Sequence, residues 1–222
     1  MRVEREFYLR KTLQVAQDLL GKYIIRKYKK NFLIGKIVET EAYIGPKDKA
    51  SHAYSKKNKN PKEKLKIIKE NWYKIVRHVE NKEKFINRIL KCKNCKVTKR
   101  NIAEYLRGGH IYIYLIYGNY YQLNITTYKE GYPECVLIRS LEPIENLKNP
   151  KGPGNLCKEL KLDSSFYGED LVLSRKIWLD YGEKIEKRKI TKAKRIGIDY
   201  AEDYKNKLWR FYIKDNIWVS KK

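Results

Sequence analysis

The sequence is poor in cysteine and lacks any long apolar run. Its four cysteines, in a chain of 222 residues, do not form the disulfide framework of a small secreted domain. No stretch of about 18 apolar residues could span a membrane, and the N-terminus lacks the charged-then-apolar pattern of a signal peptide. We therefore expect a soluble, intracellular protein in a reducing compartment, with no membrane partner.

Acidic residues are also scarce relative to basic ones. Against 51 lysines and arginines stand 26 aspartates and glutamates, which gives a formal net charge of +25. Such a field attracts polyanions, and 19 tyrosines and 4 tryptophans add aromatic faces on which bases can stack. Nucleic acid is the favoured partner; an acidic membrane surface is the alternative, but the missing apolar run argues against a membrane partner. An AT-rich genome would explain part of this composition by mutational bias.

The order of predicted elements indicates an α+β fold. Residues 12–20 predict a helix that Thr12 caps and Gly21 ends. Residues 22–28 and 32–43 are strand-like runs at hairpin spacing. Because the order of elements is mixed, we expect a single domain, residues 1–222, around a mostly antiparallel sheet. A predicted antiparallel meander comprises residues 110–118, 120–128 and 134–143. A glycine- and proline-rich entry to a helix follows at residues 148–162, and strand character returns at 192–200 and 208–220.

A lysine-dense stretch interrupts this pattern and predicts a helical insertion at about 55–97, because its apolar residues recur at helical spacing. It contains Cys92 and Cys95, which are half of a zinc site, and only His78 lies nearby. We expect no bound metal. The segment "KGPGNLC" lacks the lysine-serine ending of a phosphate-binding loop, so we expect no cofactor.

Two charged residues in strand-like segments are candidates for catalysis. In "IVETEAYIGPKDKASHA", Glu39, Glu41 and Tyr43 share one strand face. Glu41 is either a general base that activates water or an ion-paired structural residue. Arg139, inside the apolar run "CVLIRSL", requires a carboxylate partner if buried, so a structural pair is its alternative role. His52 is a base, a ligand, a stacking surface or a solvated loop residue.

Several segments together resemble the alkyladenine (3-methyladenine) DNA glycosylase family over most of the chain. They are "AQDLLGKYI", "GKIVETEAYIGPKDKASHA", "TKRN", "GGHIYIYLIYGNYYQLNI", "CVLIRSLEP", "GPGNLC", "RIGI" and "WRFYI…WVS". The resemblance implies a monofunctional repair enzyme that flips a damaged purine out of duplex DNA and hydrolyses its N-glycosidic bond. It also implies double-stranded DNA with damaged purines as the partner, and we expect a monomer in the nucleoid or cytoplasm of a prokaryote or the nucleus of a eukaryote.

The resemblance assigns roles to the site residues. Glu41 is the implied general base, and Arg139 helps to bind its water. Tyr117 is the implied wedge that fills the gap left by the flipped nucleotide. Glu39 has no implied catalytic role and is read as structural. The implied base pocket consists of Tyr43, His52 and Tyr114, which stack on the base, and Asn124, which opposes the 2-amino group of guanine.

Three departures from the family pattern accompany the match. About forty residues, 54–97, are inserted next to the DNA-facing side. Glu104 and Tyr105 stand where the family usually has Met-Phe, and a carboxylate near phosphate is unfavourable, so we expect this loop to be placed differently. Gln122 replaces a common cysteine and is read as a packing residue. The sequence does not choose among 3-methyladenine, 7-methylguanine, hypoxanthine and ethenoadenine, and a catalytically silent DNA-binding protein is the alternative function.

Overall fold

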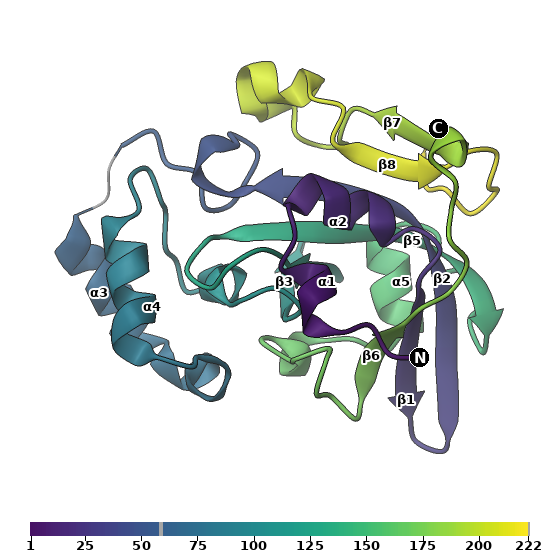
Figure 1. The fold of residues 1–222 in the computed structure, drawn as a ribbon, viewed down its shortest axis with the longest axis horizontal. Coiled ribbons are helices and arrows are strands. Elements are labelled where there is room, and N and C mark those ends of the chain that lie inside the picture. Colours follow the sequence, from purple (N-terminus) through teal and green to yellow (C-terminus); the bar gives the residue numbers. More distant parts are fainter. Residues whose placement is uncertain (58–59, 222) are drawn as a thin grey trace.

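The computed structural model describes residues 1–57 and 60–221. Residues 58 and 59, which fall in the expected insertion, and residue 222 lie outside the described residues. One antiparallel sheet organises the chain, with strands in the order β3-β4-β5-β2-β1-β6 and with β7 and β8 added beside β2 (Figure 1). The fold is therefore α+β, as the sequence predicts. The strands are β1 (Tyr23–Tyr28), β2 (Asn31–Ile44), β3 (Ile111–Ile116), β4 (Tyr120–Thr126), β5 (Glu134–Glu145), β6 (Ile177–Asp180), β7 (Ile190–Ala193) and β8 (Arg210–Ile213).

The long strand β2 is the centre of the sheet. It pairs with β5 along most of its length, while its other edge pairs first with β1 and then, at residues 39–41, with β8. The predicted hairpin of β1 and β2 and the predicted meander of β3, β4 and β5 are both confirmed. Because two different strands share one edge of β2, the sheet curls, and the second half of β2 is buried from both sides.

Some helices cover the sheet, and others lie beyond one of its ends. The α-helices are α1 (Arg5–Tyr8), α2 (Thr12–Asp18), α3 (Pro61–Glu70), α4 (Lys82–Lys91) and α5 (Pro153–Glu159), and the 3-10 helices are η1 (Gly45–Lys47), η2 (Trp72–Lys74), η3 (Val76–His78), η4 (Ile102–Tyr105), η5 (Ser164–Phe166), η6 (Lys187–Lys189) and η7 (Asp199–Asn206). Helices α3 and α4 lie together beyond one end of the sheet (Figure 1). Among the described residues, no helix combines the length and the apolar character that crossing a bilayer requires.

Two hydrophobic clusters hold these layers together. The larger one lies between the sheet and helices α1, α2 and α5. The second joins Ile68 of α3 and Phe85 and Ile89 of α4 to Tyr105 of η4 and Tyr112 of β3. Burial of these side chains, at about 1.5–3 kcal/mol each for a full side chain, fixes the helical segment against the back of β3. The helical segment therefore shares this second cluster with η4 and β3.

Two local expectations are wrong, and one strand was not predicted. Thr12 does not cap α2, because its hydroxyl contacts Thr127 and Glu134 and the cap position is Lys11 without a side-chain bond. Strand β6 was not predicted from the sequence, because a strand of four residues is too short to show a clear periodic pattern. The C-terminal strand runs are also much shorter than expected, since η7 and irregular backbone occupy most of residues 194–209.

Candidate active site

Arg139 lies at an irregularity in the pairing of β2 and β5. The register shifts between Glu39 and Thr40, which leaves Arg139 without a partner across the strand pair. Such a bulge re-aims a side chain and is common beside active sites. The guanidinium lies between two glutamates, with Nε 3.3 Å from Glu39 Oε1 and Nη1 3.3 Å from Glu41 Oε1.

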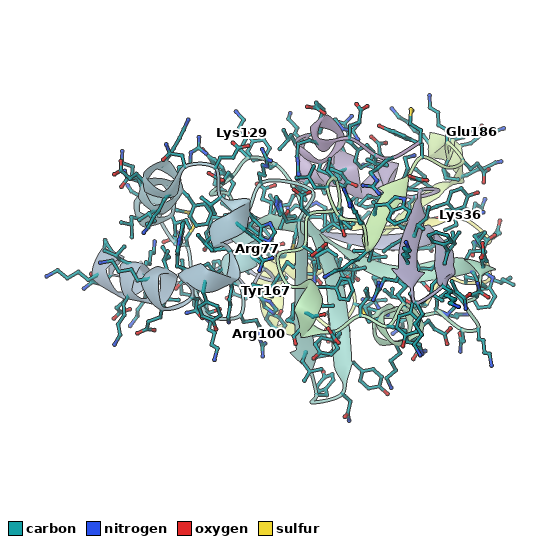
Figure 2. All side chains as sticks on the ribbon, turned by 90° about the horizontal axis from the view of Figure 1, so that it is seen from below. Lys36, Arg77, Arg100, Lys129, Tyr167 and Glu186 are labelled. Atoms are coloured by element: carbon teal, nitrogen blue, oxygen red, sulfur yellow. A yellow bond between two sulfur atoms is a disulfide. The ribbon has the colours of Figure 1, made fainter. Side chains whose placement is uncertain are left out.

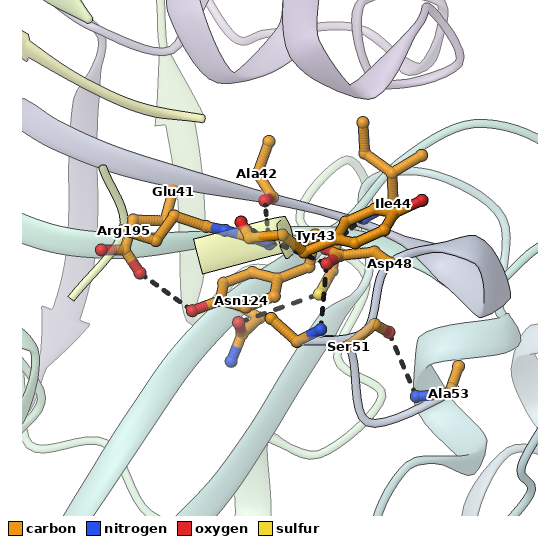
Figure 3. A network of polar contacts seen from close by, with 12 residues as sticks. Glu41, Ala42, Tyr43, Ile44, Asp48, Ser51, Ala53, Asn124 and Arg195 are labelled. Atoms are coloured by element: carbon orange, nitrogen blue, oxygen red, sulfur yellow. Dashed lines mark hydrogen bonds and ion pairs between the residues drawn. The ribbon is translucent and has the colours of Figure 1, made fainter. Parts of the chain in front are cut away.

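Glu41 is fully buried, and both of its carboxylate oxygens have partners. The backbone N–H of Ile196 donates to Oε1 at 2.8 Å, and Arg139 contacts the same oxygen. The hydroxyl of Tyr43 donates to Oε2 at 2.9 Å (Figure 3). A buried carboxylate is tolerated only with such partners, so this wall of the site is built around a negative charge.

Glu39 occupies a different environment on the same face of β2. Its Oε1 accepts from Arg210 Nη1 at 2.9 Å, and its Oε2 accepts from the backbone N–H of Ser220 at 2.7 Å. These contacts anchor β8 and the C-terminal segment to β2. The geometry supports the structural role expected for Glu39.

One cavity of about 790 Å³ brings the expected site residues together. This volume is in the range of small-molecule sites. Glu41 lies behind the cavity wall, in contact with three lining residues, Tyr43, Arg139 and Ile196. The other six expected residues line the cavity directly: Tyr43, His52, Tyr114, Tyr117, Asn124 and Arg139.

Aromatic rings form the sides of this cavity. The ring of His52 lies 4.8 Å from that of Tyr114, and its Nδ1 is 2.7 Å from the hydroxyl of Tyr112. Burial, followed by the charges of Arg100 and Lys96, lowers the pKa of His52 to about 4. The imidazole is therefore neutral at pH 7, and a positively charged ring can approach it without repulsion.

Asn124 is fixed at the inner end of the cavity. Its Nδ2 donates to the backbone carbonyls of Tyr112 at 3.1 Å and Gln122 at 3.2 Å. Its Oδ1 lies 3.8 Å from the thiol of Cys135. Because the amide cannot rotate without losing these bonds, Asn124 presents a rigid obstacle to any group that enters the cavity.

Tyr117 lies at the tip of the β3–β4 hairpin and is 89% exposed. Its φ is 48° and that of Gly118 is 70°, the pattern of a tight hairpin turn whose two central residues have positive φ. For a residue other than glycine, this backbone conformation costs on the order of 1 kcal/mol or more. The turn projects an aromatic side chain into solvent at the mouth of the cavity.

A buried ion pair that the sequence patterns do not reveal supports the site. Arg195 and Asp48 are both fully buried, with Nη1 and Oδ2 2.5 Å apart, and the guanidinium lies 4.7 Å from the ring of Tyr43 (Figure 3). Arg195 also donates to the backbone carbonyl of Ala42 at 2.9 Å. The segment "RIGI", which contains Arg195, could have indicated this pair. Nothing in the sequence indicates that Asp48, 147 residues away, is its partner.

Two departures from the family pattern lie in the cavity itself. Glu104 does not face the exterior: it is 1% exposed and lines the cavity from η4. Gln122, read as a packing residue, lines it as well. Because Glu104 is buried in the cavity, its carboxyl group is not exposed on the surface where it could lie beside a phosphate.

A second cavity, of about 530 Å³, adjoins the first and is rich in basic groups. The two share His52, Arg100 and Tyr200. Figure 2 shows Arg100 and Tyr167 where the helical segment meets the sheet. The basic residues of this second cavity come from the two ends of the helical segment and from nearby loops: Lys49, Lys56, Lys96 and Arg100.

The cysteines are arranged differently from a metal site. Cys92 and Cys95 are joined by a disulfide, while Cys135 and Cys157 are buried free thiols. Within the described residues there is no group of three or more His, Cys, Asp or Glu side chains placed to hold a metal ion.

A buried carboxylate behind an aromatic cavity, a guanidinium in its wall and basic groups in the adjoining cavity suit a flat ring attached to a polyanion. The comparison with protein families agrees with this class. The sequence pattern of methylpurine-DNA glycosylase (MPG) matches residues 6–69 and 90–217, so the chain belongs to the methylpurine-DNA glycosylase family. It is a DNA glycosylase, a hydrolase of N-glycosyl bonds.

Similar proteins match along almost their whole length. A protein of Natranaerobius thermophilus is 36% identical over 235 residues, covering 99% of both chains. One of Clostridium tetani is 38% identical over 243 residues and covers all of both, and one of Borreliella burgdorferi is 36% identical over 226 residues. All three are assigned as 3-methyladenine DNA glycosylases. The match to the family pattern is interrupted only at residues 70–89, within the predicted insertion.

Proposed function

We propose that this protein releases damaged purines from duplex DNA by flipping the nucleotide into the cavity and hydrolysing its N-glycosidic bond. One observation carries the proposal. Six expected site residues line a single cavity, and the carboxylate of Glu41 lies directly behind its wall beside Arg139. This is the arrangement that a water-activating base needs when the sugar of a flipped nucleotide reaches the same wall.

Glu41 acts as the general base in this proposal. It takes a proton from the water that attacks the sugar carbon, while Arg139, 3.3 Å away, orients the carboxylate and the water. Departure of the base leaves an oxocarbenium-like sugar, which a nearby carboxylate stabilises. The product is an abasic site.

The aromatic walls select the base. An electron-poor alkylated purine stacks well between Tyr43 and the ring pair of His52 and Tyr114, and a neutral His52 does not repel a cationic base. Stacking offsets part of the unstacking energy, which is about a few kcal/mol. Asn124, fixed by two backbone carbonyls, opposes the 2-amino group of guanine and so disfavours that normal base.

Tyr117 supports the flipped state from outside the cavity. Its exposed ring at the hairpin tip fills the space that the nucleotide leaves in the duplex. We infer that the protein acts as a monomer, because all the groups used here belong to one chain.

The test uses duplexes that each carry one lesion: 3-methyladenine, 7-methylguanine, hypoxanthine or ethenoadenine. Abasic sites are detected by alkaline cleavage and free bases by mass spectrometry. The wild type is expected to release at least one of these bases. Glu41→Gln is expected to bind the same duplex but to release the base about 10²–10⁴-fold more slowly, the usual contribution of a general base. Full activity of this variant at neutral pH would exclude Glu41 as the base.

A further inference from the structure

Glu104 is a second buried carboxyl group in the same cavity, and nothing in the roles described above uses it. Its side chain comes from η4 and is 1% exposed. Oε1 lies 3.3 Å from Ser51 Oγ and 3.7 Å from Cys135 Sγ. Since the same sulfur is 3.8 Å from Asn124 Oδ1, Cys135 lies between Glu104 and Asn124, and all three side chains line the cavity.

The polar partners of this carboxyl are all neutral. They are the hydroxyl of Ser51, the amide of Asn101 at 3.5 Å and the thiol of Cys135. No ion pair joins Glu104 to a cation among the described residues. Arg195 is paired with Asp48, and Arg139 is paired with Glu39 and Glu41. The charged and titratable groups that face this end of the cavity are Asp48, His52, Arg100, Tyr105, Tyr112, Tyr114, Cys135 and Tyr167.

These surroundings favour the protonated acid. Burial is the largest cause and the carboxylate of Asp48 adds to it, and together they raise the pKa of Glu104 to about 8 despite the hydrogen bonds from Ser51, Cys135 and Asn101. A carboxyl with this pKa carries its proton at pH 7. A protonated carboxyl can donate a hydrogen bond or a proton, which the carboxylate of Glu41 cannot do.

We propose that Glu104 is a catalytic acid that gives a proton to the departing base when the flipped base is uncharged. This inference rests on the proposed glycosylase function and deepens it. The glycosidic bond breaks with its electron pair on the base, and the proton of Glu104 passes to a ring nitrogen or carbonyl oxygen of that base. The water oxygen bonds to the sugar carbon and its proton passes to Glu41. Glu41 has then gained one proton and Glu104 has lost one, and exchange with solvent restores both.

The substrate class follows from charge. A cationic base, such as 7-methylguanine, leaves as a neutral molecule and needs no proton. A neutral base, such as hypoxanthine, would leave as an anion, which is a poorer leaving group unless an acid protonates it. Glu104 therefore extends the pocket from alkylated, cationic purines to deaminated, uncharged ones.

The experiment measures single-turnover release of hypoxanthine and 7-methylguanine by the wild type, Glu104→Gln and Glu104→Met. Both variants are expected to release hypoxanthine about 10²-fold more slowly or worse, while 7-methylguanine release stays within about threefold of wild type. Release of 7-methylguanine also shows that each variant is folded. Glu130→Gln is the matched control, because Glu130 is likewise a mostly buried carboxyl whose pKa is raised first by burial, and it lies outside the cavity.

The outcomes separate this proposal from the proposed function. Equal losses on both lesions would show a structural role and overturn the inference, as would unchanged release of hypoxanthine. A wild type that releases 7-methylguanine but no hypoxanthine also overturns it, while the glycosylase function stands. A wild type that releases neither lesion, nor the other lesions named above, contradicts the proposed function itself.

Discussion

Two ends of the cavity, one beside Arg139 and one beside η4, each have a buried glutamate next to them, yet these glutamates differ in what surrounds them. Glu41 is 0% exposed and is paired with a guanidinium, a backbone N–H and a phenol. Glu104 is 1% exposed and has only neutral partners. Burial is therefore the same, and the difference lies in the neighbours: Glu41 has a cationic partner, whereas Glu104 has neutral partners and a raised pKa. In other enzymes, paired carboxyls in unlike environments divide base and acid work in this way.

The largest expected effect comes from removing the cation at the charged end. Arg139→Met leaves Glu39 and Glu41 with one fewer buried partner, and breaking a buried pair from one side costs about 3–5 kcal/mol. We expect a fall of this size in the free energy of unfolding, measured by urea denaturation. Arg188→Met, which removes an exposed pair with Glu186, should change it by no more than about 0.5 kcal/mol. A loss below about 1 kcal/mol for Arg139→Met would show that the two buried glutamates do not depend on this guanidinium.

The neutral end should respond to pH. The folded protein holds the Glu104 proton up to a pKa of about 8, whereas the unfolded chain releases it near its ordinary value of 4.5. Between these values the native state binds more protons, so this group's contribution to stability is full at low pH and falls as pH rises. As pH rises from 5 to 8, the free energy of unfolding of Glu104→Gln should therefore increase relative to that of the wild type by up to about 1.4 kcal/mol per pH unit.

The measurement is a series of urea denaturations of the wild type and Glu104→Gln at matched pH values. Because both proteins contain the same histidines, the opposite pH dependence of His52, whose pKa is lowered to about 4, cancels in the difference. A difference in stability that stays constant from pH 5 to 8 would mean that Glu104 is ionised in the native state.

Tyr117 tests whether the mouth of the cavity acts separately from its two ends. Tyr117→Ala should weaken binding to lesion duplexes and slow base release together by about 1–3 kcal/mol, the contribution of one aromatic ring stacked on a base. Its thermal stability should not change, because the side chain is exposed. Tyr132→Ala, at another exposed tyrosine outside the cavity, is the control. If Tyr117→Ala flips a fluorescent base such as ethenoadenine as completely as the wild type does, the wedge role is wrong.

The smallest expected effect concerns the basic cavity beside the site, where we propose that the helical segment contacts DNA. Deletion of residues 56–96 is unsuitable, since Ile68, Phe85 and Ile89 belong to the core behind the cavity. The double variant Lys56→Ser and Lys96→Ser instead removes two charges that line this cavity. Each phosphate contact contributes about 0.9 to the logarithmic salt slope, so binding to undamaged DNA should become less salt-dependent by up to about 2.

The matched control for this prediction is Lys29→Ser with Lys30→Ser, at the β1–β2 turn. Relative rates on different lesions should stay unchanged in both double variants. Equal salt slopes for the two would refute the contact between this cavity and DNA. A changed lesion preference in the Lys56 and Lys96 variant would show that the helical segment influences the pocket.

Sequence patterns revealed one end of the cavity better than the other. The alternation in β2 placed Glu39, Glu41 and Tyr43 on one face, and dense β-branched and aromatic residues marked β3, β4 and β5. The placement of Arg139 depends on a bulge, and strand periodicity carries no signal for a bulge. The burial of Glu104 depends on the packing of η4 against β3, β4 and β5 and on its contact with Ser51, which are tertiary contacts between segments far apart in the sequence. Local patterns predict faces, and they do not predict which distant faces meet.

The protonation of Glu104 is the most direct test of the contrast between the two ends. Infrared spectroscopy detects the carbonyl stretch of a protonated carboxyl group, which a carboxylate lacks. At pH 6, we expect a protonated-acid band in the wild type that Glu104→Gln removes and Glu41→Gln retains. In the wild type this band should disappear as pH rises through about 8. If Glu104→Gln removes no protonated-acid band at pH 6, Glu104 is ionised in the folded protein and its neighbours do not make it an acid.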